Sequence, residues 1–240
     1  MILSDRMILA AIKAGDIVID PFDPKALGTN SYDVHLGDVI KTYKIQKERY
    51  HEIGALDCKV DNPTMRHEIG PEGFVLRPGT LYLGSTKEYT ETRKHVPFLD
   101  GKSSIGRLGI TIHCTAGRGD VGFCNHWTLE IHVIEPVRVY AGMPIGQLIY
   151  FETGEVDLDY ATKASAKYRE RCAEPVASYM YKNFDPAIDD PPMGGPPVYN
   201  DDLPRADHAY LSAGDNPYAS GDHAYRGCSL CGQQRSAHPQ

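Results

Sequence analysis

The 240-residue sequence has no apolar run approaching the roughly 18 to 20 residues that a membrane-spanning helix requires. The basic and then apolar stretches of a secretory signal are missing from its N-terminus as well. From these absences we expect a cytoplasmic protein with no membrane partner. The six cysteines are scattered along the chain. In a reducing compartment they favour free thiols over a disulfide framework.

Basic residues are not in excess, because 25 lysines and arginines stand against 32 acidic residues, a formal net charge of −7. This balance argues against general nucleic-acid binding. From position 184 onward the chain has eight aspartates and three arginines but no glutamate or lysine, a net charge of −5. The remainder is therefore nearly neutral. Its local basic residues could still hold a polyphosphate together with a shared divalent cation.

The C-terminal residues differ in composition from the rest of the chain. Residues 185–240 hold eight of the 17 prolines, and the tetrapeptide at 207–210 recurs at 222–225. Such a composition buries little apolar surface, which predicts one folded domain over 1–184 and a disordered tail over 185–240. Near the end of the tail, Cys228, Cys231 and His238 could form part of a small zinc site, and a free dithiol is the alternative.

The pattern over 1–184 predicts a mainly β fold. The first fifteen residues are typical of a helix, with Ser4 as the N-cap, Ile8, Leu9 and Ile12 on an apolar stripe, and Gly15 as the stop. Short apolar runs between glycine and proline turns follow, at 73–79, 81–84, 109–114, 127–134, 137–140 and 145–151. Many short strands of this kind indicate a β-sandwich or a barrel-like domain.

Residues 101–130 are the most informative stretch of the chain. Asp120 occupies a glycine-flanked turn, and Glu130 interrupts the strand-like run at 127–133. A carboxylate among apolar strand residues is costly unless it is paired or has a chemical role. Ser103 and Arg107 are four positions apart after a glycine, so a short helix would bring them to one pocket. The first N–H groups of that helix, at 101–104, would be open to a phosphate.

Motifs in this stretch and elsewhere resemble those of the dCTP deaminase family, a branch of the dUTPase-like superfamily. The matches run in order from residue 1 to about 184. The matching stretches are Met1-Ile2-Leu3-Ser4-Asp5-Arg6, Ile19-Asp20-Pro21-Phe22-Asp23, Asn30-Ser31-Tyr32-Asp33-Val34-His35-Leu36-Gly37, Gly101-Lys102-Ser103-Ser104-Ile105-Gly106-Arg107-Leu108-Gly109, His113-Cys114-Thr115-Ala116 through Gly122-Phe123, Thr128-Leu129-Glu130, Gly142-Met143-Pro144-Ile145-Gly146-Gln147-Leu148 and Ala166-Lys167-Tyr168-Arg169.

The resemblance implies a distorted jelly-roll-like β-barrel with small flanking helices, assembled as a homotrimer with composite active sites. It implies hydrolytic deamination of dCTP to dUTP and ammonia, which supplies dUMP for thymidylate synthesis. A partly buried carboxylate suits the proton transfers from water to the base and to the leaving amine. Glu130 would be this group, and Ser103 and Arg107 would position the water and the base.

The resemblance also implies a set of substrate-binding residues. Ala116 would meet the base through its backbone, Asp120 the deoxyribose, and His113 would line the pocket. The triphosphate, with Mg²⁺ bound to it and no catalytic zinc, would lie against basic and polar side chains. These are Lys102, Ser104, Lys167, Tyr168 and Arg171. Several positions depart from the family pattern. After Tyr168 the family usually continues with glutamine and glycine, whereas this chain has Arg169-Glu170-Arg171-Cys172. In the turn at Asp120, Gly119 replaces a frequent isoleucine and Val121 a frequent proline.

Several alternatives remain open from the sequence. His113 to Gly117 is similar to the bifunctional members that release dUMP and pyrophosphate, whereas Arg118 is similar to the members that only deaminate. A plain dUTPase is the nearer alternative enzyme, and a non-catalytic nucleotide sensor the more remote one. A zinc-dependent cytidine deaminase would need a proline before a CxxC pair, and Arg226-Gly227 stands there instead.

Overall fold

The computed structural model describes residues 1–44 and 55–185. All contacts reported below lie in the first of two units, Met1–Met193. The second unit, Gly194–Gln240, lies outside the described residues. The disorder predicted from residue 186 onward and the zinc ligands predicted at Cys228, Cys231 and His238 fall there too, and the domain boundary at 184 stays a prediction.

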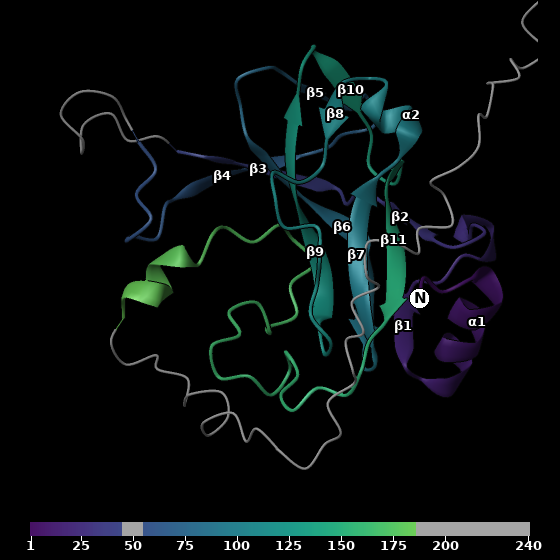
Figure 1. Ribbon diagram of the computed structural model, residues 1–240. Helices are drawn as coiled ribbons and strands as arrows, with labels where there is room; N and C mark the ends of the chain where they lie inside the picture. The colour runs from purple at the N-terminus through teal and green to yellow at the C-terminus, as the bar shows by residue number, and fades with distance from the viewer. Residues whose placement is uncertain (45–54, 186–240) are drawn as a thin grey trace, which may run out of the picture. The chain divides into compact units, whose positions relative to one another are not determined.

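Most strands belong to one six-stranded antiparallel sheet (Figure 1). Its order is β4 (Thr64–Glu68), β3 (Val39–Tyr43), β6 (Tyr82–Thr92), β9 (Cys124–Val133) and β8 (Ile110–Thr111), with β1 (Ile17–Asp20) paired to β6. A second sheet orders β2 (Tyr32–His35), β11 (Pro144–Glu152) and β7 (His95–Gly101), and β5 (Phe74–Leu76) pairs with β10 (Val137–Val139). The prediction of a mainly β fold with small flanking helices is confirmed.

The described helices are short. Helix α1 (Asp5–Ala14) has the predicted bounds, because the Ser4 hydroxyl accepts a hydrogen bond from the Met7 N–H and Gly15 ends the helix in the left-handed conformation at φ 75°. The others are α2 (Ser103–Gly106), η1 (Pro24–Ala26) and η2 (Met180–Phe184). In the ranges that the structure describes, no helix combines the length and the apolar character needed to cross a membrane.

Strand β9 separates the core from an open face. Trp127, Leu129 and Ile131 point into the core and are at most 7% exposed. Because successive side chains of a strand alternate between its faces, Thr128 and Glu130 lie on the opposite side, where both are half-buried. Glu130 can therefore be reached from outside the core, as a catalytic carboxylate requires.

The strand predicted at 109–114 is shorter than expected, since only Ile110–Thr111 pair with β9 as β8. Three residues later the ladder gives way to a side-chain interaction, because the Cys114 N–H donates to the Glu130 carboxylate instead of to a neighbouring strand. The chain then leaves the sheet as a loop, and this departure exposes Glu130 at the loop's edge.

Candidate active site

Glu130 is fixed by hydrogen bonds to the chain that precedes the loop. Its backbone N–H donates to the Ile112 carbonyl at 2.8 Å, and its Oε2 accepts from the Cys114 N–H at 2.9 Å. A backbone N–H bonded to a carboxylate is a strong, charge-assisted interaction. The other carboxylate oxygen is left for a ligand or for water, so the group could serve as an acceptor and donor of protons.

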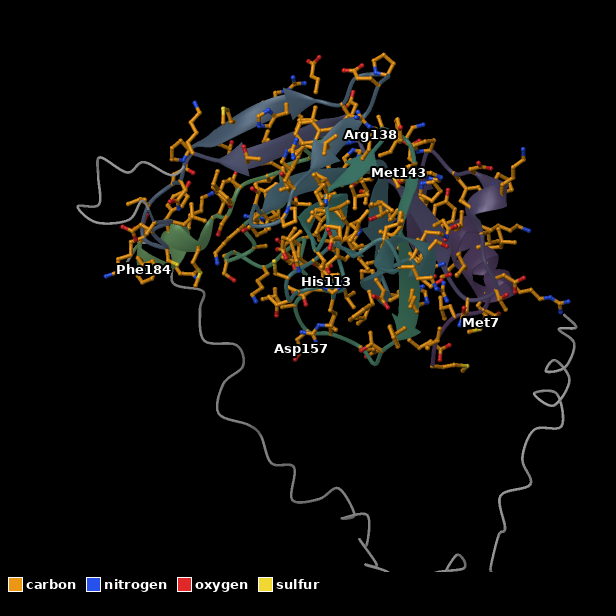
Figure 2. All side chains as sticks on the ribbon, turned by 90° about the horizontal axis from the view of Figure 1, so that it is seen from above. Met7, His113, Arg138, Met143, Asp157 and Phe184 are labelled. Atoms are coloured by element: carbon orange, nitrogen blue, oxygen red, sulfur yellow. The ribbon has the colours of Figure 1, made fainter. Side chains whose placement is uncertain are left out.

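The loop after Cys114 is attached to strand β7. The Leu99 N–H donates to the Gly117 carbonyl at 2.6 Å, and the Gly119 N–H donates to the Pro97 carbonyl at 2.8 Å. Ala116 and Asp120 are both exposed on this loop. His113 is half-buried among packed side chains, edge-on to the Phe98 ring (Figure 2). Three predicted residues thus lie on one loop that begins beside Glu130.

The Asp120 turn rests on aromatic side chains. The Phe123 N–H donates to the Asp120 carbonyl at 3.1 Å, and the Phe123 ring lies 4.6 Å from the Trp127 ring and 5.9 Å from the Tyr160 ring, centroid to centroid. The Tyr160 N–H donates to the Val121 carbonyl at 2.7 Å. Rigid rings beneath the turn hold the Asp120 carboxylate at the surface.

Helix α2 carries Ser103 and Ser104, and Arg107 follows as its C-cap. All three are exposed, and the buried Ile105 anchors the helix. The helix packs beside β8 at one end of the sheet (Figure 1). Within the described part of the chain, no hydrogen bond or ion pair joins these three side chains to Glu130.

Lys102, which precedes α2, has a partner in its own chain. Its ammonium forms an ion pair with Asp33, whose second oxygen accepts from the Gln147 amide at 2.9 Å. Both members of the Lys102–Asp33 pair are only about a quarter exposed or less, at 22% and 25%. A phosphate at Lys102 would have to share the ammonium with Asp33.

Residues 167–178, hereafter the C-terminal segment, cross β9, β6 and β3. The Tyr168 ring stacks on Tyr179 at 5.2 Å, and the Tyr168 N–H donates to the Tyr160 hydroxyl at 3.0 Å. Arg171 lies over the Tyr89 ring at 4.2 Å, with its guanidinium 3.9 Å from Asp20. Half-buried Lys167 is the first residue of this segment. The structure thus gives Arg171 an aromatic partner on β6.

Two tyrosines near the predicted residues were missed by the sequence analysis. Burial raises the pKa of the Tyr43 phenol, partly offset by the hydrogen bond from the Ser178 N–H, and nearby Tyr168 and Glu130 raise it further. Burial also raises the pKa of Tyr160, and Asp120 adds to the rise. Only the folded chain brings Tyr43 close to Glu130, since 87 positions separate them in the sequence.

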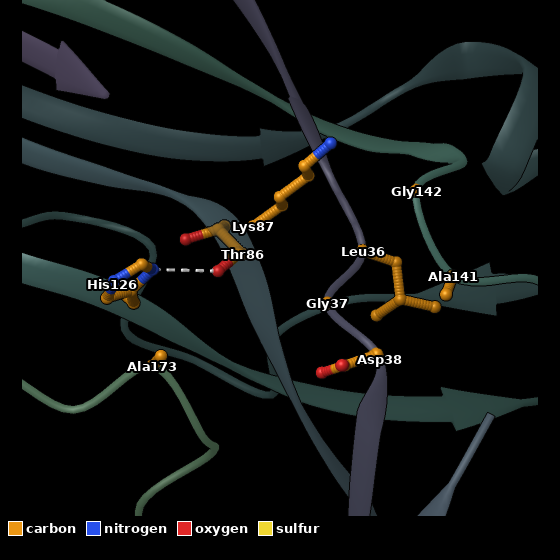
Figure 3. A pocket seen from close by; sticks show the side chains of 9 residues that line it. All are labelled: Leu36, Gly37, Asp38, Thr86, Lys87, His126, Ala141, Gly142 and Ala173. Carbon is orange, nitrogen blue, oxygen red and sulfur yellow. Dashed lines mark hydrogen bonds between the residues drawn. The ribbon is translucent and has the colours of Figure 1, made fainter. Parts of the chain in front are cut away.

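A pocket of about 370 Å³ lies farther along the open face of the sheet (Figure 3). It is lined by the 36–38 loop, by Thr86 and Lys87 of β6 and by His126 of β9, whose Nδ1 bonds the Thr86 carbonyl at 3.1 Å. None of the predicted site residues lines it. The chemistry is therefore better sought at Glu130, where a carboxylate meets the loop that follows Cys114.

Metal binding has no ready-made ligand set in residues 1–44 and 55–185. No group of three or more His, Cys, Asp or Glu side chains there is placed to hold a metal ion.

Glu130 with the 113–120 loop offers a carboxylate and backbone groups, and α2 with Arg107 offers hydroxyls, a guanidinium and N–H groups. Together these two half-sites suit the addition of water to a polar ring and the binding of an anion.

Comparison with known proteins identifies the family of this chain. Residues 2–153 match the family model described as dCTP deaminase-like. The chain belongs to this family. A relative from Clostridium acetobutylicum named "dCTP deaminase, dUMP-forming" is 45% identical over 185 residues, covering 77% of this chain and 99% of the relative. A protein of the same name from Leptospira biflexa is 43% identical over 186 residues, covering 77% and 99%.

Solved structures give a weaker likeness. The crystal structure of 2′-deoxycytidine 5′-triphosphate deaminase from Agrobacterium tumefaciens aligns with a TM-score of 0.48 and 18% identity, over 62% of this chain and 47% of that one. This similarity is too low to inform the chemistry.

Proposed function

We propose that the protein deaminates dCTP hydrolytically and then cleaves the triphosphate, releasing ammonia, dUMP and pyrophosphate. The observation that supports it most directly is the Glu130 carboxylate, held by the Cys114 N–H on the open face of β9. The names of the relatives at 43–45% identity favour dUMP over dUTP as the nucleotide product. Deamination that stops at dUTP is the second candidate, favoured by Arg118.

In the deamination step, water adds to C4 of the cytosine ring and ammonia leaves, so that a C–O bond replaces the C–N bond. Glu130 takes a proton from the attacking water and delivers protons to N3 and to the leaving amine. Ser103 and Arg107 hold the water and polarise the base, and the Ala116 backbone binds the base edge. In the second step, water attacks the α-phosphorus, the bond to the pyrophosphate oxygen breaks, and Asp120 orients the water.

The site is composite in this proposal, because Ser103, Ser104 and Arg107 come from a neighbouring copy in a homotrimer. Support comes from the described part of the chain, in which no hydrogen bond or ion pair joins Ser103, Ser104 or Arg107 to Glu130. Leu108 and Ile134, which are 53% and 72% exposed, flank α2 and β8. Exposed apolar side chains of this size are typical of a surface that another copy covers. Lys102, Lys167, Tyr168 and Arg171 then hold the triphosphate with its Mg²⁺.

The test is to incubate the purified protein with dCTP and Mg²⁺ and to quantify ammonia and nucleotides by chromatography. Equal amounts of ammonia, dUMP and pyrophosphate are expected. Ammonia with accumulating dUTP would support the second candidate. Cleavage of dUTP without ammonia from dCTP would make the protein a dUTPase, and inactivity on both nucleotides would favour a sensor.

A further inference from the structure

Asn125 of β9 has a buried side chain in which every polar position is used. It is 3% exposed. Its Nδ2 donates to the carbonyls of Tyr168 at 3.0 Å and Glu170 at 2.8 Å, and its Oδ1 accepts from the N–H groups of Cys172 at 3.0 Å and His126 at 2.9 Å. An asparagine amide has two donor hydrogens and two acceptor lone pairs, so its hydrogen-bonding capacity is filled.

Three of these four bonds go to alternate residues of the C-terminal segment, at 168, 170 and 172. In an extended chain the polar groups of alternate residues point to the same edge. The amide therefore binds one edge of the segment as a neighbouring strand would. A shift of the segment by one residue would leave buried polar groups without partners, which is costly. Asn125 thus fixes the register of this stretch against β9.

The other anchors of the C-terminal segment hold its later part. The Ser85 hydroxyl donates to the Ala173 carbonyl at 2.8 Å. Glu174 forms ion pairs with Lys41 and Arg66, and the Thr128 hydroxyl accepts from the Val176 N–H at 3.1 Å. At the start of the segment, the Tyr160 hydroxyl accepts from the Tyr168 N–H at 3.0 Å. Between 168 and 172, most of the side-chain-to-backbone anchoring comes from Asn125.

We propose that Asn125 is a positioning residue for triphosphate binding. By fixing 168, 170 and 172, it sets the positions of the adjacent Lys167 and Arg171, and of Tyr168. This inference rests on the proposed function, in which those side chains hold the triphosphate. Asn125 itself contacts no substrate and transfers no proton. Its loss should weaken binding of the phosphate chain and leave binding of the nucleoside moiety unchanged.

The experiment measures dissociation constants for dCTP and dCMP by calorimetry with Mg²⁺ present, in a Glu130→Gln background that prevents turnover. The Asn125→Ala and Asn125→Asp variants are compared with the background. Aspartate keeps the size of the side chain and its acceptor but removes both donors. We expect dCTP to bind about tenfold more weakly in each variant, as for the loss of buried hydrogen bonds, and dCMP to change less than about twofold.

Ser85→Ala is the matched control, because it removes one buried hydrogen bond to the same segment after position 172. It should lower the thermal midpoint without selective loss of dCTP. Equal weakening of dCTP and dCMP by the Asn125 variants, or the same selective loss in the Ser85 variant, would overturn the proposal. So would unchanged dCTP binding in the Asn125 variants.

A further measurement uses the full wild-type chain and does not depend on how a variant folds. The Cys172 N–H, bonded to Asn125, should be strongly protected from hydrogen exchange in the nucleotide-free protein, and free exchange would contradict the proposal. Ammonia release from dCTP by the wild type tests the proposed function separately. The binding measurements need no turnover, so the two can fail independently.

Discussion

Gly119 and Trp127 occupy one shared space beneath the Asp120 turn. A Cβ atom on Gly119 would lie 2.8 Å from Cη2 of Trp127 and 2.9 Å from Cγ of Pro97. The indole thus fills the room that a side chain at position 119 would take, and its Nε1 donates to the Thr90 hydroxyl at 2.9 Å, which holds the ring there. The isoleucine that many family members have at this position would not fit here.

Gly119→Ala should therefore destabilise the fold by overpacking, by about 1–3 kcal/mol in the free energy of unfolding. Chemical denaturation measures the change. Gly154→Ala is the control, since a Cβ there meets no atom within 4 Å. In a Trp127→Leu background, Gly119→Ala should lower the free energy of unfolding by a markedly smaller amount. Additive effects of the two changes would show that the residues do not share this space.

Glu130→Gln should lower kcat for ammonia release at least about 100-fold, because an amide cannot shuttle protons. Its oxygen can still accept from the Cys114 N–H, so the loop should keep its conformation and dCTP should bind nearly as before. Stopped assays and calorimetry measure the two quantities. Glu135→Gln, an exposed position five residues further on, should have wild-type kcat. A Glu130 variant with substantial turnover would remove this residue from the mechanism.

Mixing two inactive variants tests the composite site. Ser103→Ala and Glu130→Gln each disable one half, so dissociation and reassembly of a 1:1 mixture should restore about a quarter of the wild-type activity by random pairing. A mixture of Glu130→Ala and Glu130→Gln should release no ammonia, because both changes fall on the same half. Persistent inactivity of the first mixture, with mixed trimers present by mass spectrometry, would place the whole site in one chain.

Metal removal should act through the substrate. We expect EDTA to raise KM for dCTP strongly and excess Mg²⁺ to restore it, because the cation neutralises the triphosphate. A zinc-selective chelator added with Mg²⁺ in excess should leave kcat unchanged. Loss of kcat that only Zn²⁺ reverses would point to a catalytic zinc and contradict the Glu130 mechanism.

The Glu174 ion pairs predict a pH-dependent contribution to stability. Hydrogen bonds from Arg66 and then Lys41 hold the pKa of Glu174 below its usual value of 4.5. A carboxyl with a lowered folded-state pKa stabilises the protein above its unfolded pKa, and this contribution disappears as pH falls through the folded value. Glu174→Gln should thus lower the thermal midpoint by up to a few degrees at pH 7.

At a pH below the folded-state pKa of Glu174, the wild type and Glu174→Gln should have the same thermal midpoint. Scanning calorimetry at that pH and at pH 7 measures the two midpoints. A difference that persists in acid would mean that packing around the side chain, and not its charge, anchors the C-terminal segment at this point.

Local structure and family membership could be predicted from the amino-acid sequence alone. Ser4 and Gly15 bound α1 as predicted, since capping acts within a few residues. Alternation around Glu130 predicted β9, although the strand begins three residues earlier than expected, because Asn125 and His126 are polar. The motifs led to a family that the match over residues 2–153 confirms.

Which of these residues meet depends on the tertiary fold. It brought Tyr43 close to Glu130, gave Lys102 an ion pair with Asp33 and placed Arg171 on Tyr89. It also turned Asn125, an ordinary polar residue in the sequence, into the anchor of 168–172. Such contacts join positions tens of residues apart and depend on strand register. Local patterns cannot encode them, because a pattern fixes which face a side chain occupies but not what lies opposite that face.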